Sequence, residues 1–121
     1  MENKGKTLVL GASTNPSRYS YLAVSSLLKN GFPVVPMGIK KGSIKGLQIE
    51  NEKPDLDIDT VTLYLSPTNQ INYYDYILSL HPKRVIFNPG TYNPELIEKL
   101  KAQNIEVVEA CTLVMLSTGT Y

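Results

Sequence analysis

Short apolar runs alternate along the chain with segments in which apolar residues recur every three or four positions. The runs lie at residues 7–10, 32–37, 60–65, 84–88 and 105–109. Runs of this length, bounded by Gly, Pro or Asn, are typical of buried strands. The segments between them have the spacing of helices with one buried face. The alternation therefore predicts a parallel sheet with covering helices.

Three helices are predicted from this spacing and from their ends. The first covers residues 19–30 and ends at Asn30-Gly31, where glycine suits the left-handed capping position. The second begins at Ser66-Pro67 and the third at Asn93-Pro94, each an N-cap followed by proline at the first helical position. The third ends near Asn104. The predicted inward faces are Ala23, Val24, Leu27 and Leu28; Ile71, Tyr74, Ile77 and Leu78; and Leu96, Ile97 and Leu100.

Five strands with right-handed crossovers predict an α/β fold: a Rossmann-like, doubly wound parallel sheet in the order 3-2-1-4-5, with helices on both faces. We expect one domain over residues 1–121. Residues 38–59 are predicted to be a long connection with a short helical or extended piece. Prolines 33 and 36 are expected at the ends of the second strand. The apolar tail after Cys111 is expected to form a last helical turn.

Composition limits the classes of function. Hydrophobic residues make up 42% and charged residues 19%, as in an ordinary soluble domain. The net charge is +1 without a basic block, which disfavours nucleic-acid binding. One Cys and one His exclude a disulfide framework and disfavour a zinc site. No apolar run approaches membrane-spanning length, so we expect a cytoplasmic protein without membrane contact.

The turn after the first strand is the best candidate for ligand binding, because ligands of such sheets bind beyond the carboxyl ends of the strands. Gly11 allows a sharp turn, and Ala12 and Ser13 leave room above it. The next helix offers free N–H groups to a phosphate, and Arg18 can form a charge-assisted pair with it. Ser13, Asn15 and Ser17 can add hydrogen bonds. Only the first glycine of the GxGxxG pattern is present, so a turn without a ligand stays an alternative.

The end of the second strand helps to distinguish nucleotides. A classical NAD site has an acid there that binds the ribose hydroxyls. This chain has Lys40 and Lys41 and no acid. That favours a ribose carrying an extra phosphate, as in coenzyme A or NADP. The alternative is that both lysines are solvated loop charges.

Two further strand ends supply candidate ligand contacts. Ser66 and Thr68 begin the second helix, where capping is their expected role and a ligand contact is additional. Asn88 and Gly90 follow the fourth strand and could present an amide or backbone groups. They could equally form a turn that leads to the cap at Asn93.

No catalytic set is recognisable. Cys111 follows the last strand, but His81 is expected at the opposite edge of the sheet, so the thiol lacks a base. The acids Asp55, Asp57 and Asp59 lack the pattern of a calcium loop. Tyr73 and Tyr76 are candidates for an exposed aromatic patch, either a self-association face or a surface without function.

The order of these motifs resembles the small stand-alone coenzyme A-binding domain family, relatives of the nucleotide domain of the succinyl-CoA synthetase α subunit. The turn Gly11-Ala12-Ser13-Thr14-Asn15-Pro16-Ser17-Arg18 is similar to the opening GAS-x-NPSR turn of that family. Lys40, the Asn88-x-Gly90 segment and Cys111 match further positions. Gly38-Ile39 departs from the usual Asn-Pro, and Leu65-Ser66-Pro67 lacks the arginine that many members have before the proline. The resemblance implies a diphosphate at the first turn and Lys40 near the adenosine end.

Three hypotheses follow from these observations. The first is a non-catalytic module that binds coenzyme A or an acyl-CoA. The second is an NADP-dependent reductase, for which the chain leaves little room for a substrate domain. The third is a ligand-regulated scaffold or interaction subunit, in which Tyr73 and Tyr76 meet a protein partner or a second copy of the chain.

Overall fold

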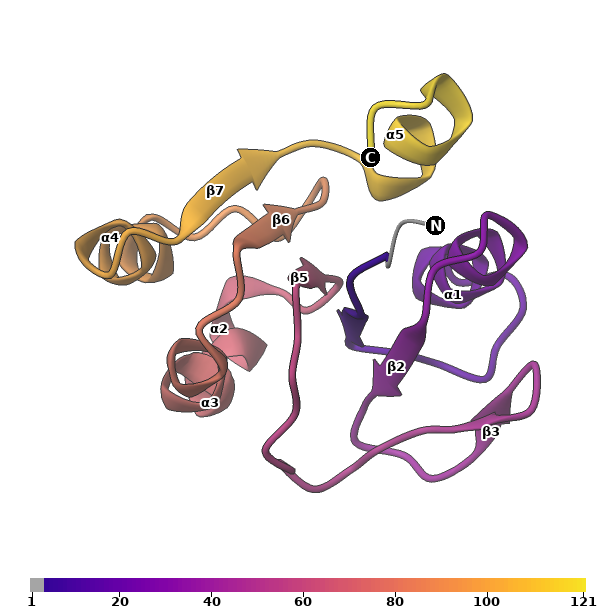
Figure 1. Cartoon of the computed structure of the whole chain (residues 1–121). Helices are drawn as coiled ribbons and strands as arrows, with labels where there is room; N and C mark the ends of the chain where they lie inside the picture. Colours follow the sequence, from indigo (N-terminus) through magenta and orange to yellow (C-terminus); the bar gives the residue numbers. More distant parts are fainter. Residues whose placement is uncertain (1–3) are drawn as a thin grey trace.

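A five-stranded parallel sheet lies between two groups of helices in the computed structural model, which describes residues 4–121 (Figure 1). The predicted domain begins at residue 1, and residues 1–3 lie outside the described part. The strands are β1 (Thr7–Leu10), β2 (Val34–Met37), β3 (Ser43–Ile44), β4 (Leu47–Gln48), β5 (Thr60–Leu63), β6 (Arg84–Phe87) and β7 (Glu106–Glu109). The helices are α1 (Tyr19–Lys29), α2 (Pro67–Gln70), the 3-10 helix η1 (Ile71–Tyr73), α3 (Tyr74–Leu80), α4 (Pro94–Ala102) and α5 (Thr112–Thr118).

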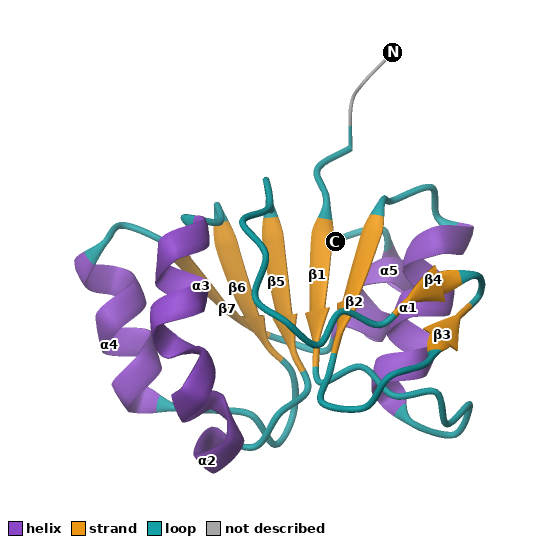
Figure 2. Ribbon diagram, turned by 90° about the horizontal axis from the view of Figure 1, so that it is seen from below, coloured by secondary structure: helices purple, strands orange, loops and turns teal. Residues whose placement is uncertain are grey.

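The strand order is β2-β1-β5-β6-β7, and all neighbours in this sheet are parallel (Figure 2). A Rossmann-like α/β fold is confirmed, but the predicted order 3-2-1-4-5 is wrong. The third strand of the sheet in sequence, β5, lies beside β1 instead of outside β2. The chain therefore crosses over β1 between β2 and β5. The direction in which the chain adds strands to the sheet reverses between β1 and β5, which makes this the switch point of the sheet. A site there is built from the loops that follow these two strands.

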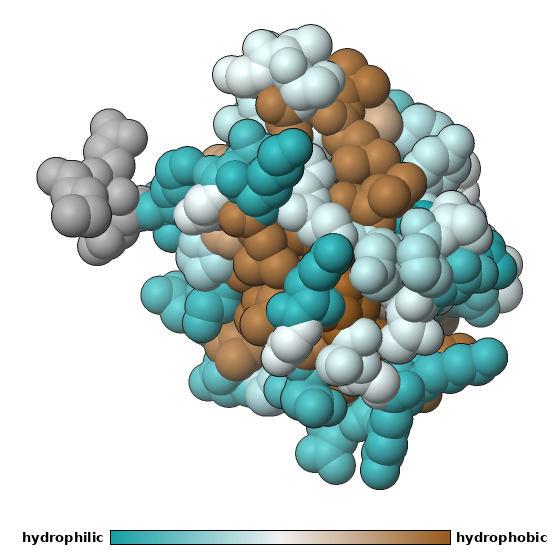
Figure 3. All heavy atoms as spheres, turned by 90° about the vertical axis from the view of Figure 1, so that its right-hand side faces the viewer, coloured by the Kyte–Doolittle hydropathy of each residue, from teal (hydrophilic) through white to brown (hydrophobic). Residues whose placement is uncertain are grey.

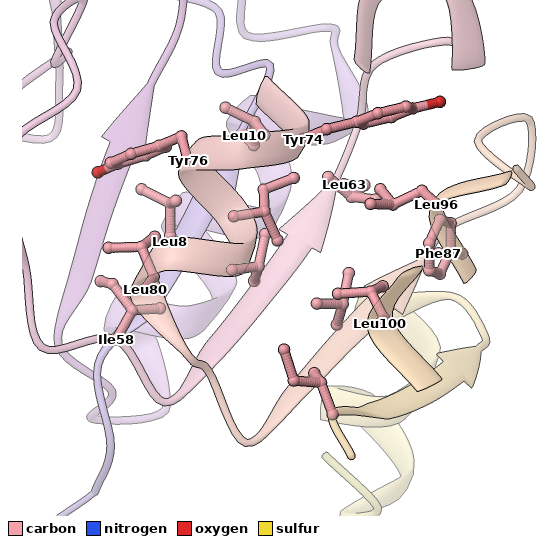
Figure 4. Close-up of a cluster of buried hydrophobic side chains, with 14 of the residues drawn as sticks. Leu8, Leu10, Ile58, Leu63, Tyr74, Tyr76, Leu80, Phe87, Leu96 and Leu100 are labelled. Atoms are coloured by element: carbon pink, nitrogen blue, oxygen red, sulfur yellow. The ribbon is translucent and has the colours of Figure 1, made fainter. Parts of the chain in front are cut away.

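Helices cover both faces of the sheet, as predicted, and each face has its own core. One core joins β1, β5 and β6 to α3 and α4, with Leu8, Leu63 and Leu96 among its buried side chains (Figure 4). The other joins β1 and β2 to α1, through Val9, Val24 and others, and includes Leu116 of α5. Figure 2 shows α3 and α4 on one side of the strands and α1 and α5 on the other.

The helices begin and end close to the residues that the sequence predicts, whereas the predicted second helix is interrupted in its middle. Asn93 caps α4 by accepting a hydrogen bond from the Leu96 N–H at 3.3 Å. The predicted second helix is divided into α2, η1 and α3. The 3-10 helix has about three residues per turn, fewer than an α-helix, so side chains in and after it face other directions than in a continuous α-helix. As a result Ile71, predicted to face inward, is 55% exposed, and Gln70 is fully buried.

The connection at residues 38–59 contains an antiparallel pair, β3 and β4, and then returns to the edge of the sheet. The Glu50 N–H donates to the Pro36 carbonyl at 2.9 Å, and the Glu50 carbonyl accepts from the Gly38 N–H at 2.9 Å. Pro36 lies inside β2 and not at its end, which corrects the prediction. It is tolerated because its nitrogen points, like its carbonyl, to the outer edge of the sheet. The last predicted turn is the seven-residue helix α5.

The expected aromatic patch does not form. Tyr76 is buried, and its hydroxyl donates to the Pro54 carbonyl at 2.7 Å. Tyr73 is half-buried, with the Lys53 ammonium 5.0 Å from its ring centre. Exposed hydrophobic side chains include Leu22 of α1 and Val114 of α5. Figure 3 shows hydrophobic residues at the surface on this side of the molecule. Tyr73 and Tyr76 therefore do not form a joint docking surface.

Candidate functional site

A pocket of about 430 Å³ lies at the carboxyl ends of the central strands. The loops after β1, β2, β5 and β6 contribute its walls, which places the pocket at the switch point between β1 and β5. Its lining residues are Gly11, Ala12, Ser13, Thr14, Arg18, Tyr19, Ser20, Ile39, Lys40, Ile49, Tyr64, Leu65, Ser66, Pro89, Gly90 and Thr91. This is the edge of the sheet at which the sequence predicts ligand binding.

The first wall of the pocket is the loop between β1 and α1. Gly11 has a φ of +98°, a conformation that strongly favours glycine. The N–H groups of Gly11 and Ala12 both donate to the Met37 carbonyl at 2.8 Å, which fixes the loop to the end of β2. Further along, the Asn15 Oδ1 accepts from the Ser17 N–H at 3.0 Å and from its hydroxyl at 2.8 Å. Asn15 and Ser17 thus shape the loop, and their side chains bond each other.

The start of α1 is open to an anion. Its N-cap residue is Arg18, and within residues 4–121 no side chain caps this end by a hydrogen bond. The first turn also contains no acidic residue. The first N–H groups of a helix lack partners within the helix and carry partial positive charge, equivalent together to about half a unit charge. Since Tyr19 and Ser20 line the pocket, this end of the helix faces it.

Two cationic side chains line the pocket, and within residues 4–121 neither of them forms a salt bridge. Arg18 and Lys40 are both exposed pocket residues, whereas the neighbouring Lys41 is not part of the lining. Among the described residues the single salt bridge joins Lys83 to Asp59. Over the same residues the lining contains no Asp or Glu. The electrostatic field in the pocket therefore favours an anion near Arg18 and near Lys40.

Close packing of two loops explains Gly38, where the sequence departs from the family pattern. A Cβ atom at Gly38 would lie 2.5 Å from the carbonyl oxygen of Ala12. No L-residue with a side chain fits this position unless the backbone of one loop moves. Gly38 therefore lets the end of β2 touch the first loop and brings Lys40 to the pocket.

The opposite wall is held by two buried amides that sequence reasoning did not select. The Gln70 Nε2 donates to the carbonyls of Leu65 at 2.9 Å and Thr91 at 2.8 Å. The Asn93 Nδ2 donates to the Gln70 Oε1 at 2.9 Å and to the Tyr74 hydroxyl at 2.8 Å. These bonds join the loop after β5 to the loop after β6. They fix the part of the pocket that faces the first loop.

Asn88 has a structural role in place of the predicted ligand contact. It is 3% exposed. Its Nδ2 donates to the Thr62 hydroxyl at 2.7 Å and to the Leu63 carbonyl at 2.8 Å. Its Oδ1 accepts from the Thr112 N–H at 2.8 Å. The amide therefore ties β5, β6 and the start of α5 together, and it is not available to a ligand.

Tyr64 lies below the pocket, where its hydroxyl is buried and, over residues 4–121, meets no hydrogen-bond partner of good geometry. Burial raises the pKa of Tyr64 from 10.0 to about 12, and the nearby Thr112 hydroxyl opposes this shift only in part. The phenol thus stays neutral at physiological pH. It is a poor proton donor or acceptor there.

Tyr64 is expected to contribute to a loss of stability at alkaline pH, together with Tyr74, Tyr76 and Tyr121, whose pKa values burial also raises. The pKa of Tyr64 is higher in the folded state than in the unfolded chain, so its contribution is complete below pH 10 and is lost as the pH rises towards 12. Urea unfolding at several pH values measures the free energy of unfolding over this range. Tyr64→Phe is expected to flatten the decline and to leave stability at pH 7 unchanged or higher, because it removes an unpartnered hydroxyl. Tyr92→Phe, at an exposed tyrosine, is the matched control; an equal effect of both variants would contradict the assignment to Tyr64.

The structure brings seven of the predicted site residues together in the pocket lining: Gly11, Ala12, Ser13, Arg18, Lys40, Ser66 and Gly90. The other five lie outside the lining: Asn15, Pro16, Ser17, Thr68 and Asn88. Ser66 is at the N-cap position of α2, but its side chain makes no capping bond among the described residues. Ile39, exposed and directly before Lys40, was missed although its position in the sequence could have indicated it.

Cys111 lies outside this pocket, at the N-cap position of α5, and is half-buried. His81 is exposed at the carboxyl end of α3, before the amino end of β6, as expected. Within residues 4–121 no group of three or more His, Cys, Asp or Glu is arranged to hold a metal ion. In the same part of the chain no helix has the length and apolar character needed to cross a membrane.

A parallel sheet with an uncapped helix start at its switch point is typical of α/β proteins that bind nucleotides. The family model described as the CoA binding domain matches residues 5–117. The chain therefore belongs to this family of coenzyme A-binding domains, as the resemblance in sequence suggested. No curated protein matches it.

Solved structures share the fold of this chain. The chain is similar to the crystal structure of an uncharacterised protein, with 54% identity, a TM-score of 0.96 and coverage of 99% of this chain and 100% of that chain. A hypothetical protein from Pyrococcus horikoshii OT3 has 24% identity and a TM-score of 0.87, with coverage of 95% and 83%. The dinucleotide forming acetyl-coenzyme A synthetase 1 of Ca. Korarchaeum cryptofilum has 18% identity and a TM-score of 0.73, with coverage of 89% and 26%. The last two similarities concern the fold alone.

Proposed function

We propose that this protein binds coenzyme A or an acyl-CoA without catalysing a reaction, with the diphosphate at the loop between β1 and α1. The observation that supports it most is the uncapped start of α1, which faces a pocket with two free cations and no lining carboxylate in the described chain. Membership of the CoA-binding domain family favours coenzyme A over other phosphorylated nucleotides.

Each wall has a role in this proposal. Gly11, Ala12 and Ser13 let the diphosphate approach the backbone, and Arg18 pairs with it. Lys40, at the end of β2, binds the additional phosphate on the ribose. The arm of the ligand then runs past Ser66 towards Gly90 and Thr91. Asn15, Pro16 and Ser17 support the loop from outside the pocket. Thr68 lies outside the pocket, and the Asn88 amide, which is bonded within the protein, makes no hydrogen bond to the ligand.

The absence of a reaction is proposed from the chemistry of the lining. Over residues 4–121 its ionisable side chains are Arg18, Lys40, Tyr19 and Tyr64. Arginine stays protonated in proteins, and burial keeps Tyr64 neutral. General acid–base catalysis near neutral pH needs a group that can exchange a proton there. The lining contains no His, Cys, Asp or Glu in this part of the chain, so binding is the function it supports.

Lys40→Ala is expected to weaken coenzyme A binding by about tenfold, since a charge-assisted phosphate contact is lost. Isothermal titration with coenzyme A and with dephospho-CoA, which lacks the ribose phosphate, measures this effect. Against dephospho-CoA the same variant is expected to lose less than about twofold. Lys41→Ala is the matched control, because Lys41 is an exposed neighbour outside the lining. Equal losses for both ligands, or for both variants, would contradict the role of Lys40.

NADP is the second candidate ligand, because Lys40 could also bind the phosphate on its ribose. Titration of the wild-type protein with NADP at the same concentrations separates the two. Tighter binding of NADP than of coenzyme A would favour the reductase hypothesis. No saturable binding of coenzyme A up to millimolar concentration would overturn the proposal.

A further inference from the structure

A second cavity continues the candidate site beyond β6. It has a volume of about 230 Å³ and lies between the loop after β6 and the end of β7. Pro89 and Gly90 line both cavities. A Cβ atom at Gly90 would have no atom within 4 Å, so the backbone there is not covered by other groups. The two cavities are therefore neighbours along one edge of the sheet, with an open segment between them.

The walls of the second cavity combine apolar surface with one negative charge. Phe87 is buried, and Pro89, Ala110 and the half-exposed ring of Tyr92 add apolar surface. The half-buried thiol of Cys111 and the amide of Asn88, which is bonded within the protein, also line the cavity. Glu109, the last residue of β7, is the one charged residue of the lining within the described chain. Such a cavity suits an uncharged apolar group and opposes an anion.

The position of the cavity matches the far end of a long ligand. The sheet order places four strand intervals between β2, which precedes Lys40, and β7. At a spacing of about 4.8 Å per interval this edge is about 19 Å long. Coenzyme A is a linear molecule with its phosphates at one end and its sulfur at the other. With its phosphates at Arg18 and Lys40, its arm leads past Gly90, and the sulfur reaches the second cavity.

We infer that the second cavity holds the acyl group of a short, uncharged acyl thioester of coenzyme A. The inference rests on the proposed function. At about 30 Å³ for each water-sized group, the cavity has room for roughly seven such groups, which suits a thioester with about four carbons. Glu109 repels an acyl group that ends in a carboxylate. The preferred ligand is therefore an aliphatic acyl-CoA, and dicarboxylic acyl-CoA esters are rejected.

Three ligands test this preference on the wild-type protein by isothermal titration: coenzyme A, butyryl-CoA and succinyl-CoA. The two esters have acyl groups of equal carbon number, and they differ in a terminal methyl or carboxylate. Butyryl-CoA is expected to bind about tenfold more tightly than coenzyme A, because part of its apolar chain is buried. Succinyl-CoA is expected to bind about tenfold more weakly than butyryl-CoA.

Two variants assign these differences to the cavity. Glu109→Gln is expected to reduce the gap between the two esters to about twofold. Glu106→Gln makes the same change of charge at the other end of β7, where the side chain is exposed and outside the cavity, and is expected to keep the gap. Ala110→Leu fills the cavity and is expected to bring the affinities for butyryl-CoA and coenzyme A close together.

The outcomes separate this inference from the proposed function. Equal affinities of the wild-type protein for all three ligands would overturn the acyl site and leave coenzyme A binding intact. A gap between the esters that Glu109→Gln leaves unchanged would also overturn the assignment. Failure of coenzyme A and of both esters to bind would overturn both proposals.

Discussion

Replacing Gly38 with alanine is expected to lower the free energy of unfolding by about 2–3 kcal/mol and to weaken coenzyme A binding by roughly tenfold. The new Cβ would lie 2.5 Å from the Ala12 carbonyl oxygen, which is shorter than a van der Waals contact between carbon and oxygen allows. Neither loop can yield easily, because the Ala12 N–H is bonded to the Met37 carbonyl at 2.8 Å. Relief of the clash must move the first loop away from β2. Arg18 and Lys40 then no longer face one ligand.

Urea unfolding followed by circular dichroism measures the first effect, and titration with coenzyme A measures the second. Gly46→Ala is the matched control. Gly46 has a φ of +83° but would place its Cβ in open space, whereas Gly38 has no positive φ. The control is therefore expected to lose only about 1 kcal/mol from backbone strain and to bind the ligand normally. A Gly38→Ala protein as stable as the wild type would show that the two loops are not in tight contact.

Asn88→Ala is expected to lower the free energy of unfolding by about 3 kcal/mol. The variant loses three hydrogen bonds and leaves buried partners unsatisfied on β5 and at the start of α5. All three partners belong to fully buried residues, but the Thr62 hydroxyl keeps a hydrogen bond to the Thr112 hydroxyl, so the Thr112 N–H is more costly to leave unpaired. Loss of the bond to Oδ1 also removes one of the contacts that hold the start of α5 to the sheet. Denaturant unfolding gives the size of the effect.

The matched control for this variant is Asn69→Ala, which removes the same amide from an exposed position in α2. It is expected to change stability by less than about 0.5 kcal/mol. If Asn88→Ala cost no more than the control, the amide would have no structural role. Its predicted contact with a ligand would then be worth testing again.

The helices could be predicted from the sequence because particular residue types mark where a helix begins and ends. Asn93-Pro94 begins α4, and Gly31, with a φ of +82°, follows α1. The strand order could not be obtained in this way, since it depends on the path between β2 and β5. That path contains no helix, only the β3–β4 pair and an extended segment. A sequence pattern does not indicate beside which strand such a connection places the next strand of the sheet.

The sequence could predict those parts of the candidate site that depend on charged side chains or on backbone conformation. Arg18 lies in the loop after β1 and Lys40 in the loop after β2, and the carboxyl ends of parallel strands meet at one edge. The supporting amides were not predictable, because Gln70 and Asn88 resemble exposed polar residues in the sequence. Their burial depends on carbonyl and hydroxyl partners from other loops. Local spacing contains no information about those partners.

The two outer strands of the sheet, β2 and β7, influence the solubility of the protein at high concentration. An uncovered edge strand is a template for adding a further strand from another molecule, and so for aggregation. On β2 the proline at position 36 offers no N–H, and Glu50 occupies the neighbouring backbone groups. β7 has a glutamate at each end, Glu106 and Glu109, so two copies meeting edge to edge would bring like charges together. Both edges therefore disfavour growth of the sheet, and copies of this chain that associate would meet through helices or loops.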